Sequence, residues 1–299
     1  MNKFIDLHMH SLYSDDGEFS PSELVRKCKD KGIRIMAIAD HNSVRGVHEA
    51  KEVAKTHGIQ YITGIEIDCT YKAINLHILG YGIDTTGEDF IKIEENVIQQ
   101  ELKSSRKKLE LTNQLGFNIH QEDLDKLSSN GIYTGEMFAE VLLNDVRYRE
   151  NELLKPYRRE GIRSDNPYVN FYWDYYAKDK PCYKEIIYPT LEETLGLIKK
   201  NGGVAVLAHP GQNLKGHYEV FDELVTKGIQ GVEVFSNYHD EETIRFFLDK
   251  GKSSHLLITC GSDYHGKTKS AIELGETRCT INEYEIEQQL KQIGLIKKY

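Results

Sequence analysis

The sequence predicts an α/β fold, a barrel or near-barrel of about seven strands that carries an inserted subdomain. Strand and helix patterns alternate through residues 3–83, and the alternation returns from residue 190 onward. Such alternation is typical of a largely parallel sheet with helices outside it. Residues 84–189, between the two parts, are helical, charged and rich in tyrosine. We therefore predict a barrel domain of residues 1–83 and 190–299 and an inserted helical lid subdomain of residues 84–189.

The first part contains four predicted strands and two helices. "KFIDLHMH" (3–10) and "IRIMAIAD" (33–40) are the first two strands. A helix follows the first strand, with Ser20 as N-cap, Pro21 at the first helical position and Glu23 placed for a capping box. A second helix over 43–58 ends at Gly58. Strands over 59–71 and 74–83 follow, separated by a short turn near Lys72.

The insertion and the second part complete the pattern. An amphipathic helix is predicted over 89–116 and another within 132–145, whereas 147–186 is polar, aromatic and irregular. Most aromatic residues of 168–183 are expected in the core of the insertion, with one or two touching substrate. In the second part we predict helices over 190–203, 218–227, 240–250 and 282–294, and strands over 204–211, 229–237 and 255–266.

Composition narrows the functional classes. The net charge is −9, which argues against long nucleic acid as a partner because such binding needs a basic surface. The five cysteines are scattered and form no C-x-x-C pair, which is typical of reduced thiols in the cytoplasm. The sequence shows no signal peptide and no apolar run long enough to span a membrane. We expect a cytoplasmic protein, and the sequence leaves its oligomeric state open.

Histidine and carboxylate residues recur where the predicted strands end. Residues i and i+2 of a strand share a face, so neighbouring pairs can bind one ion from the same side. In a parallel barrel the strand ends open on one rim. The residues concerned are His8, His10, Asp15, Asp16, Asp40, His41, Glu66, His77, His209, Asp263 and His265.

Each of these residues also has an ordinary structural interpretation. A single histidine on a strand is more often a hydrogen-bonded core residue than a ligand, and Asp40 could cap the helix that follows it. Their common location favours a metal site instead. A mixed set of nitrogen and oxygen ligands suits Zn, Mn or Fe, and its size exceeds the coordination sphere of one ion.

The motifs "DLHMHSLYSDD", "AIADHN", "GIEI", "NLHILGY", "AVLAHPG" and "GSDYHG" resemble the signature of the polymerase and histidinol phosphatase (PHP) superfamily. The resemblance implies a distorted (β/α)7 barrel with three divalent metal ions, of Zn, Mn or Fe. It implies a first ion held by His8, His10, Glu66 and Asp263, a second by Glu66, His77 and His209, and a third by Asp15, His41 and His265.

The helical insertion resembles that of small phosphatases in this family that act on nucleotides such as nucleoside 3′,5′-bisphosphates. That group usually carries Arg and His in its insert, where this sequence has Gly135 and Met137. Phosphate contacts could instead come from the basic run 147–163, which is otherwise a solvated loop.

We expect a metal-dependent phosphoesterase that hydrolyses a phosphate monoester on a small phosphorylated, nucleotide-like substrate. Metal-bound hydroxide would attack phosphorus. Asp40, His239 and Asp263 are the catalytic candidates: Asp40 for orienting a ligand or moving a proton, His239 as leaving-group acid or a mere helix-entry residue. Histidinol-phosphate phosphatase, an amidohydrolase-like C–N hydrolase and a non-catalytic binding module are the alternatives. The C–N hydrolase commonly uses a lysine ligand, which we do not find.

Overall fold

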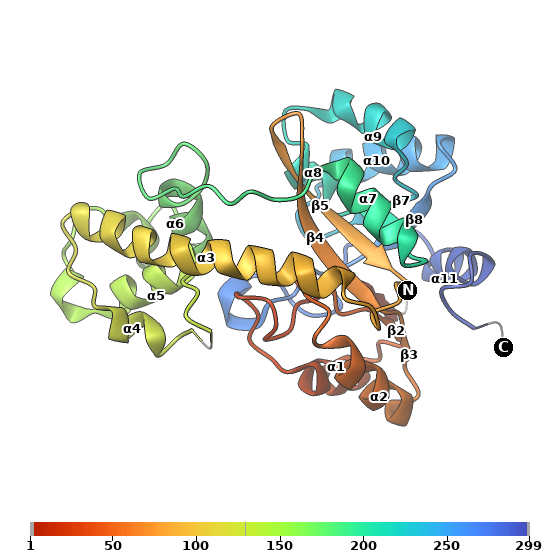
Figure 1. Cartoon of the computed structure of the whole chain (residues 1–299), viewed down its shortest axis with the longest axis horizontal. Helices are drawn as coiled ribbons and strands as arrows, with labels where there is room; N and C mark the ends of the chain where they lie inside the picture. Colours follow the sequence, from red (N-terminus) through yellow and green to blue (C-terminus); the bar gives the residue numbers. More distant parts are fainter. Residues whose placement is uncertain (1–2, 129, 298–299) are drawn as a thin grey trace.

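The computed structural model describes residues 3–128 and 130–297 and contains two sheets (Figure 1). The smaller sheet is parallel and has the order β1-β2-β3, and the larger has the order β4-β5-β6-β7-β8. The strands are β1 (Ile5–Asp6), β2 (Ile35–Met36), β3 (Gln60–Tyr61), β4 (Gly64–Tyr71), β5 (Ile74–Tyr81), β6 (Val204–Leu207), β7 (Gly231–Phe235) and β8 (Leu257–Cys260).

Backbone hydrogen bonds join the two sheets at both edges. The Leu7 amide donates to the Cys260 carbonyl at 3.0 Å, which places β1 beside β8. Near the other edge the Glu66 amide donates to the Asp40 carbonyl at 3.0 Å, so the chain after β2 lies beside β4. These contacts bring together the segments that follow β1, β2 and β8, which carry most of the histidines and carboxylates described above.

The expectation of a largely parallel arrangement is wrong for the middle of the larger sheet. β4 and β5 are antiparallel, and so are β5 and β6. For β4 and β5 the cause is local, because Lys72 and Ala73 both have positive φ, 48° and 64°. Two such residues make the tight turn that connects an antiparallel hairpin. The single strand expected over 59–71 is also divided, into β3 and β4.

The helices of the two outer parts follow the sequence signals closely. At the start of α1, Ser20 and Glu23 form the predicted capping box, and Gly58 ends α2 with φ of 67°. Apolar faces of these helices and strands fill two clusters, one centred on β4–β8 and one beneath α1 and α2. The helices are α1 (Pro21–Asp30), α2 (Val47–His57), α7 (Leu191–Lys200), α8 (Pro210–Asn213), η3 (Tyr218–Val220), α9 (Phe221–Lys227), α10 (Glu241–Ser253), η4 (Gly266–Lys269) and α11 (Glu283–Gln292).

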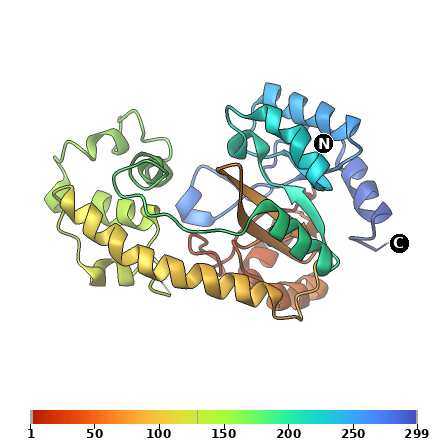
Figure 2. The ribbon, with the colours of Figure 1, turned by 45° about the horizontal axis from the view of Figure 1, so that its top comes forward.

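The insertion extends to one side of the sheets (Figures 1 and 2). Its first helix is long and runs from the sheets to a separate apolar cluster that includes Phe138, Phe171 and Tyr176. A helix, α6, lies in the region expected to be irregular, and it begins at Pro167 as its first residue. The elements are α3 (Asp89–Gln114), α4 (Gln121–Asp125), α5 (Gly135–Asn144), η1 (Val146–Tyr148), η2 (Lys155–Tyr157) and α6 (Pro167–Tyr175). The division into domains at residues 84 and 189 stays a prediction.

Within the described ranges, no helix combines the length and the apolar character needed to cross a lipid bilayer.

Candidate metal centre

The ends of the strands form one buried cage of imidazoles and carboxylates. His8, His10, Glu66 and Asp263 each place a ligand atom within 4.8 Å of the others. The Nε2 atoms of His8 and His10 lie 3.2 Å and 3.0 Å from Asp263 Oδ1. Two ligands about 2.1 Å from a shared ion lie about 3 to 3.5 Å apart, so the spacing fits one ion.

The protonation of this group shows why it needs a cation. His8 Nδ1 faces the Glu233 carboxylate at 3.1 Å, and a carboxylate only accepts, so the proton of His8 is on Nδ1. His10 Nδ1 bonds Ser14 Oγ, whose own hydrogen is directed to Asp40. With the Nδ1 atoms used in this way, each Nε2 atom can offer its lone pair to a metal ion, and the two Nε2 atoms lie 3.1 Å apart. Two lone pairs and two carboxylate oxygens face one another, and a bound cation satisfies all four.

Glu66 is the centre of the cage. Its Oε2 lies 3.2 Å from His8, 3.3 Å from His10 and 3.3 Å from His41. Its Oε1 lies 3.0 Å from His77 and 3.1 Å from His209. The two oxygens thus face two sets of imidazoles, which is the arrangement of a carboxylate that bridges two ions.

A third group contains His10, Asp16, His41 and His265. His265 Nδ1 donates to the Asp263 carbonyl, which leaves Nε2 as a lone pair 3.2 Å from Asp16 Oδ2. The structure brings Asp16 to this position and not Asp15. The Asp15 carboxylate instead accepts a hydrogen bond from Asn130 of the insertion at 2.8 Å. Because the two aspartates are adjacent, their side chains diverge, and only one can face His265.

The two oxygens of Asp263 have different surroundings. Oδ2 accepts hydrogen bonds from Tyr238 at 2.6 Å and Lys269 at 2.8 Å, whereas Oδ1, buried and without a hydrogen bond, faces His8 and His10. Asp263 also has φ of 58°, a strained value for a non-glycine residue. This backbone conformation turns Asp263, which follows β8, toward the cage.

Carboxylates outside the cage orient its ligands. Glu233, buried in β7, holds His8 Nδ1 and accepts from the His209 amide at 3.0 Å. Asp40 accepts from the Ser11 amide and from the Ser11 and Ser14 hydroxyls, and Ser14 holds His10. The contacts of Asp40 support the orienting role among the alternatives that the sequence left open.

The structure does not support His239 as the leaving-group acid. The side chain is fully buried, its Nδ1 bonds the Val234 carbonyl at 2.8 Å, and its Nε2 accepts from the Gly211 amide at 2.9 Å. Both nitrogens are thus occupied by the main chain. Burial also lowers the pKa of His239, which keeps it neutral. The sequence correctly placed His239 after β7. In the structure this side chain has a packing role.

The charges of the cage suit metal binding. Burial, with repulsion from His265 and His41, lowers the pKa of His10 to about 4, so its lone pair is free at neutral pH. Burial opposes the ionisation of Glu66, but attraction to the protonated forms of His8, His41 and His77 outweighs it and holds the pKa of Glu66 well below its usual range, so the carboxylate stabilises positive charge at the centre of the cage.

Three contributors were missed by sequence reasoning. Asp68 Oδ1 lies 3.4 Å from His41 and 3.2 Å from His77. It is two residues from Glu66, so the same-face rule could have found it. Glu233 is a carboxylate inside an apolar strand, which is also a usable signal. No sequence pattern indicated Lys269, because its side chain reaches Asp263 only when residues 266–269 form the short helix η4.

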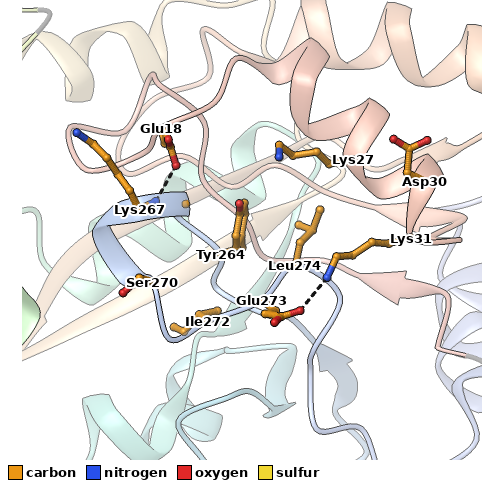
Figure 3. Close-up of a pocket in the computed structure, with 11 residues that line it drawn as sticks. Glu18, Lys27, Asp30, Lys31, Tyr264, Lys267, Ser270, Ile272, Glu273 and Leu274 are labelled. Atoms are coloured by element: carbon orange, nitrogen blue, oxygen red, sulfur yellow. Dashed lines mark hydrogen bonds and ion pairs between the residues drawn. The ribbon is translucent and has the colours of Figure 1, made fainter. Parts of the chain in front are cut away.

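A cavity of about 480 Å³ lies apart from the cage (Figure 3). The figure shows two contacts in its wall: the Lys267 backbone amide donates to Glu18, and the Lys31 ammonium pairs with Glu273. It lies behind the loop that carries His265, and Tyr264 forms part of its wall. Its lining includes none of the cage histidines, so the chemistry is not located there.

Comparison with known proteins identifies the family of the chain. The family model of the PHP domain matches residues 6–233. A 3′,5′-nucleoside bisphosphate phosphatase of Chromobacterium violaceum is 28% identical over 91% of both chains. A 5′-3′ exoribonuclease of Haemophilus influenzae is 26% identical over 89% of this chain and 91% of its own. A crystal structure from Bifidobacterium adolescentis, assigned to the metal-dependent phosphoesterases, has a TM-score of 0.79 at 25% identity and covers 98% of this chain and 97% of its own. The chain therefore belongs to the PHP domain family and is a metal-dependent phosphoesterase.

Proposed function

We propose that this enzyme hydrolyses a phosphate monoester on a small, nucleotide-like substrate and that three divalent ions, of Zn, Mn or Fe, occupy its cage. The observation that carries the proposal is the position of Glu66, whose two oxygens contact five histidines within 3.3 Å. We further propose that the two hydrogen-bonded sheets form the distorted barrel expected of the family.

The proposed ligand sets follow the geometry. His8, His10, Glu66 and Asp263 hold the first ion, and Glu66, His77 and His209 hold the second. Asp16, in place of Asp15, joins His41 and His265 for the third. Asp68 lies between His41 and His77 and adds negative charge there.

The ions supply an activated water and neutralise charge on the phosphoryl oxygens. The chain supplies the orientation of this cage. Lys269 is only 17% exposed, and its Nζ lies against the outer oxygen of Asp263. We propose that this ammonium also contacts the phosphate, because it is a cation at the edge of an otherwise anionic cage.

Two tyrosines are our candidates for contact with the organic part of the substrate. The Thr70 amide donates to the Pro189 carbonyl at 2.9 Å, so Tyr188 lies along the strand that carries Glu66 and Asp68. Burial, together with the charges of Asp68 and Glu101, raises the pKa of Tyr188 well above its usual range. Tyr172 of α6 shares these neighbours. Aromatic faces near a phosphate site suit a base or sugar ring.

The packing of the insertion also explains why position 135 does not carry the expected Arg. A Cβ atom at Gly135 would lie 2.8 Å from a ring carbon of Tyr176 and 2.9 Å from one of Tyr172. An arginine cannot fit where α5 packs against these rings. Three of the five arginines of the 147–163 run already have partners within the insertion: Arg147 pairs with Asp145, Arg158 bonds the Leu143 and Tyr148 carbonyls, and Arg163 pairs with Asp174. We therefore place phosphate recognition at the ions and Lys269.

The test is a substrate panel assayed with the Mn²⁺-loaded enzyme. It contains nucleoside 3′,5′-bisphosphates, nucleoside monophosphates, histidinol phosphate, a cyclic phosphodiester and a short RNA. We expect release of phosphate from a nucleotide monoester with the highest kcat/KM. Preference for RNA, as the name of the Haemophilus relative suggests, or for histidinol phosphate would contradict the proposal.

Matched variants locate the specificity. Tyr188→Ala is expected to raise KM for a nucleotide more than for a small phosphate ester, because stacking contributes about 1–3 kcal/mol per base. Tyr183→Ala, which removes a half-buried tyrosine of the same segment, is the control. Equal effects of the two substitutions would remove Tyr188 from the substrate site.

A further inference from the structure

A second group of ligand atoms lies outside the cage, where β8 meets the C-terminal helix. The sulfurs of Cys260 and Cys279 and a carboxylate oxygen of Glu283 are all within 4.8 Å of one another. Cys260 is the last residue of β8 and is fully buried, and Cys279 is partly buried. Glu283 is the first residue of α11 and is 4% exposed.

Glu283 uses only one of its two oxygens within the protein. Oε2 accepts from the Phe4 amide at 2.5 Å and from the Ile5 amide at 2.9 Å, which fixes the carboxylate beside β1. Oε1 is buried and has no hydrogen-bond partner among the described residues. A buried carboxylate oxygen without a donor is costly, and a cation is the simplest group that satisfies it.

The two thiols lack strong bonds of their own. Cys260 Sγ lies 3.7 Å from the Ile5 carbonyl, and Cys279 Sγ lies 3.5 Å from the Ile281 carbonyl. These are weak donor contacts that each thiol can give up. Cys279 also lines a cavity of about 320 Å³, so an ion can reach the group from solvent.

We propose that Cys260, Cys279 and Glu283 form a second metal site, which binds a thiophilic divalent cation such as Zn²⁺. Binding releases the two thiol protons to solvent and forms two metal–sulfur bonds and one metal–oxygen bond. Two thiolates, one carboxylate and the cation sum to −1. Lys3 and Arg278, which line the same cavity, offset that charge. Water fills the remaining position.

The site would connect the elements that carry the catalytic ligands. Glu283 is bonded to the start of β1, which leads to His8 and His10, and Cys260 is three residues before Asp263. The role is a structural clamp, since none of the three side chains belongs to the catalytic cage.

The test uses the spectrum of cobalt. The full-length enzyme, reduced, free of oxygen and first loaded with Mn²⁺, is titrated with Co²⁺. Thiolate ligands give cobalt an intense charge-transfer band in the near ultraviolet. The groups of the catalytic cage contain only nitrogen and oxygen ligands, so the band reports the cysteine site alone. We expect a saturable band for the wild type and its loss in Cys279→Ser.

Cys182→Ser is the matched control, because Cys182 is a buried thiol in the cluster of the insertion. It is expected to keep the band. Glu283→Gln is expected to weaken cobalt binding by about tenfold or more while it keeps both sulfurs. Cys279→Ser is expected to retain Mn²⁺-dependent phosphatase activity, which shows that it folds.

Absence of the band in the wild type would overturn the proposal, and so would a band that persists in Cys279→Ser. Formation of a Cys260–Cys279 disulfide in air, with no cobalt band after reduction, would likewise overturn it and identify a redox pair instead.

Discussion

At the scale of single residues, the function depends on carboxylates that have separate tasks. Glu66 and Asp263 turn lone pairs toward the histidines, whereas Glu233 and Asp40 hold imidazole protons in place, directly or through Ser14. We therefore expect substitution of Glu66 or Asp263 to remove an ion, and substitution of Glu233 or Asp40 only to lower the affinity for it. All four carboxylates are buried, so water cannot replace the groups that they contact. Each carboxylate therefore depends on its protein or metal partner.

Glu233→Gln tests the orienting role. The amide keeps the shape but removes the charge that faces His8 Nδ1, so the affinity for the first ion is expected to fall about 10–100-fold. Metal titration followed by calorimetry measures it. Glu276→Gln, at an exposed glutamate, is the control. Unchanged affinity in Glu233→Gln would show that the bond to His8 does not tune the ligand.

The adjacent aspartates give a second test. Asp16→Asn is expected to lower the metal content and the activity of the purified protein, because Asp16 faces His265. Asp15→Asn should retain both, since Asp15 bonds Asn130 of the insertion. Elemental analysis of the two variants decides between them. Loss of metal from Asp15→Asn alone would restore the assignment made from the sequence.

At the scale of elements, local sequence signals predicted the ends of the capped helices, whereas contacts between distant elements decided the strands, of which those expected over 3–10 and 33–40 are only Ile5–Asp6 and Ile35–Met36. Capping residues such as Ser20 and Gly58 act within a few residues, so their helices were predictable. The turn near Lys72 was also expected, but the antiparallel pairing that it produces was not, because two positive φ values at Lys72 and Ala73 reverse the chain without a glycine. Glu233 of β7 acquires its role only when the fold brings its side chain to His8, which follows β1, and no local pattern shows that contact.

The chain after β8 allows a prediction at this scale. A Cβ atom on Gly261 would lie 2.2 Å from His8 Cβ and 2.3 Å from Glu233 Oε1. Gly261→Ala is therefore expected to displace His8, lowering the melting temperature and the activity together. Gly196→Ala in α7, where no atom lies within 4 Å, is the control and should be neutral or slightly stabilising. Wild-type activity in Gly261→Ala would show that β1 and β8 separate easily.

At the scale of the whole molecule, metal binding and stability are coupled. The cage joins the ends of both sheets, and the insertion contacts the segments that carry its ligands: Asn130 bonds Asp15, next to Asp16, and Glu140 pairs with Lys267 at 3.2 Å, two residues after His265. An ion at Glu66 therefore connects segments that are far apart in the sequence. The folded protein offers this preformed site and the unfolded chain does not, so bound ions favour the folded state.

Removal of the ions is accordingly expected to lower the melting temperature. At an ion concentration about 100 times its dissociation constant, each site contributes about 2.7 kcal/mol, and chelation removes that stabilisation. Without ions, burial opposes a charge on His8, but the surrounding buried carboxylates, Glu66 and Asp263 among them, outweigh it and raise the pKa of His8 well above its usual range, so a proton on His8 is left to offset their charge. Scanning calorimetry with and without EDTA measures the shift, and Mn²⁺ should reverse it. Glu66→Gln is the control, because a variant that cannot hold the bridged ions should respond little to EDTA. Equal melting temperatures for the wild type before and after chelation, with the loss of metal verified by elemental analysis, would separate the cage from the stability of the fold.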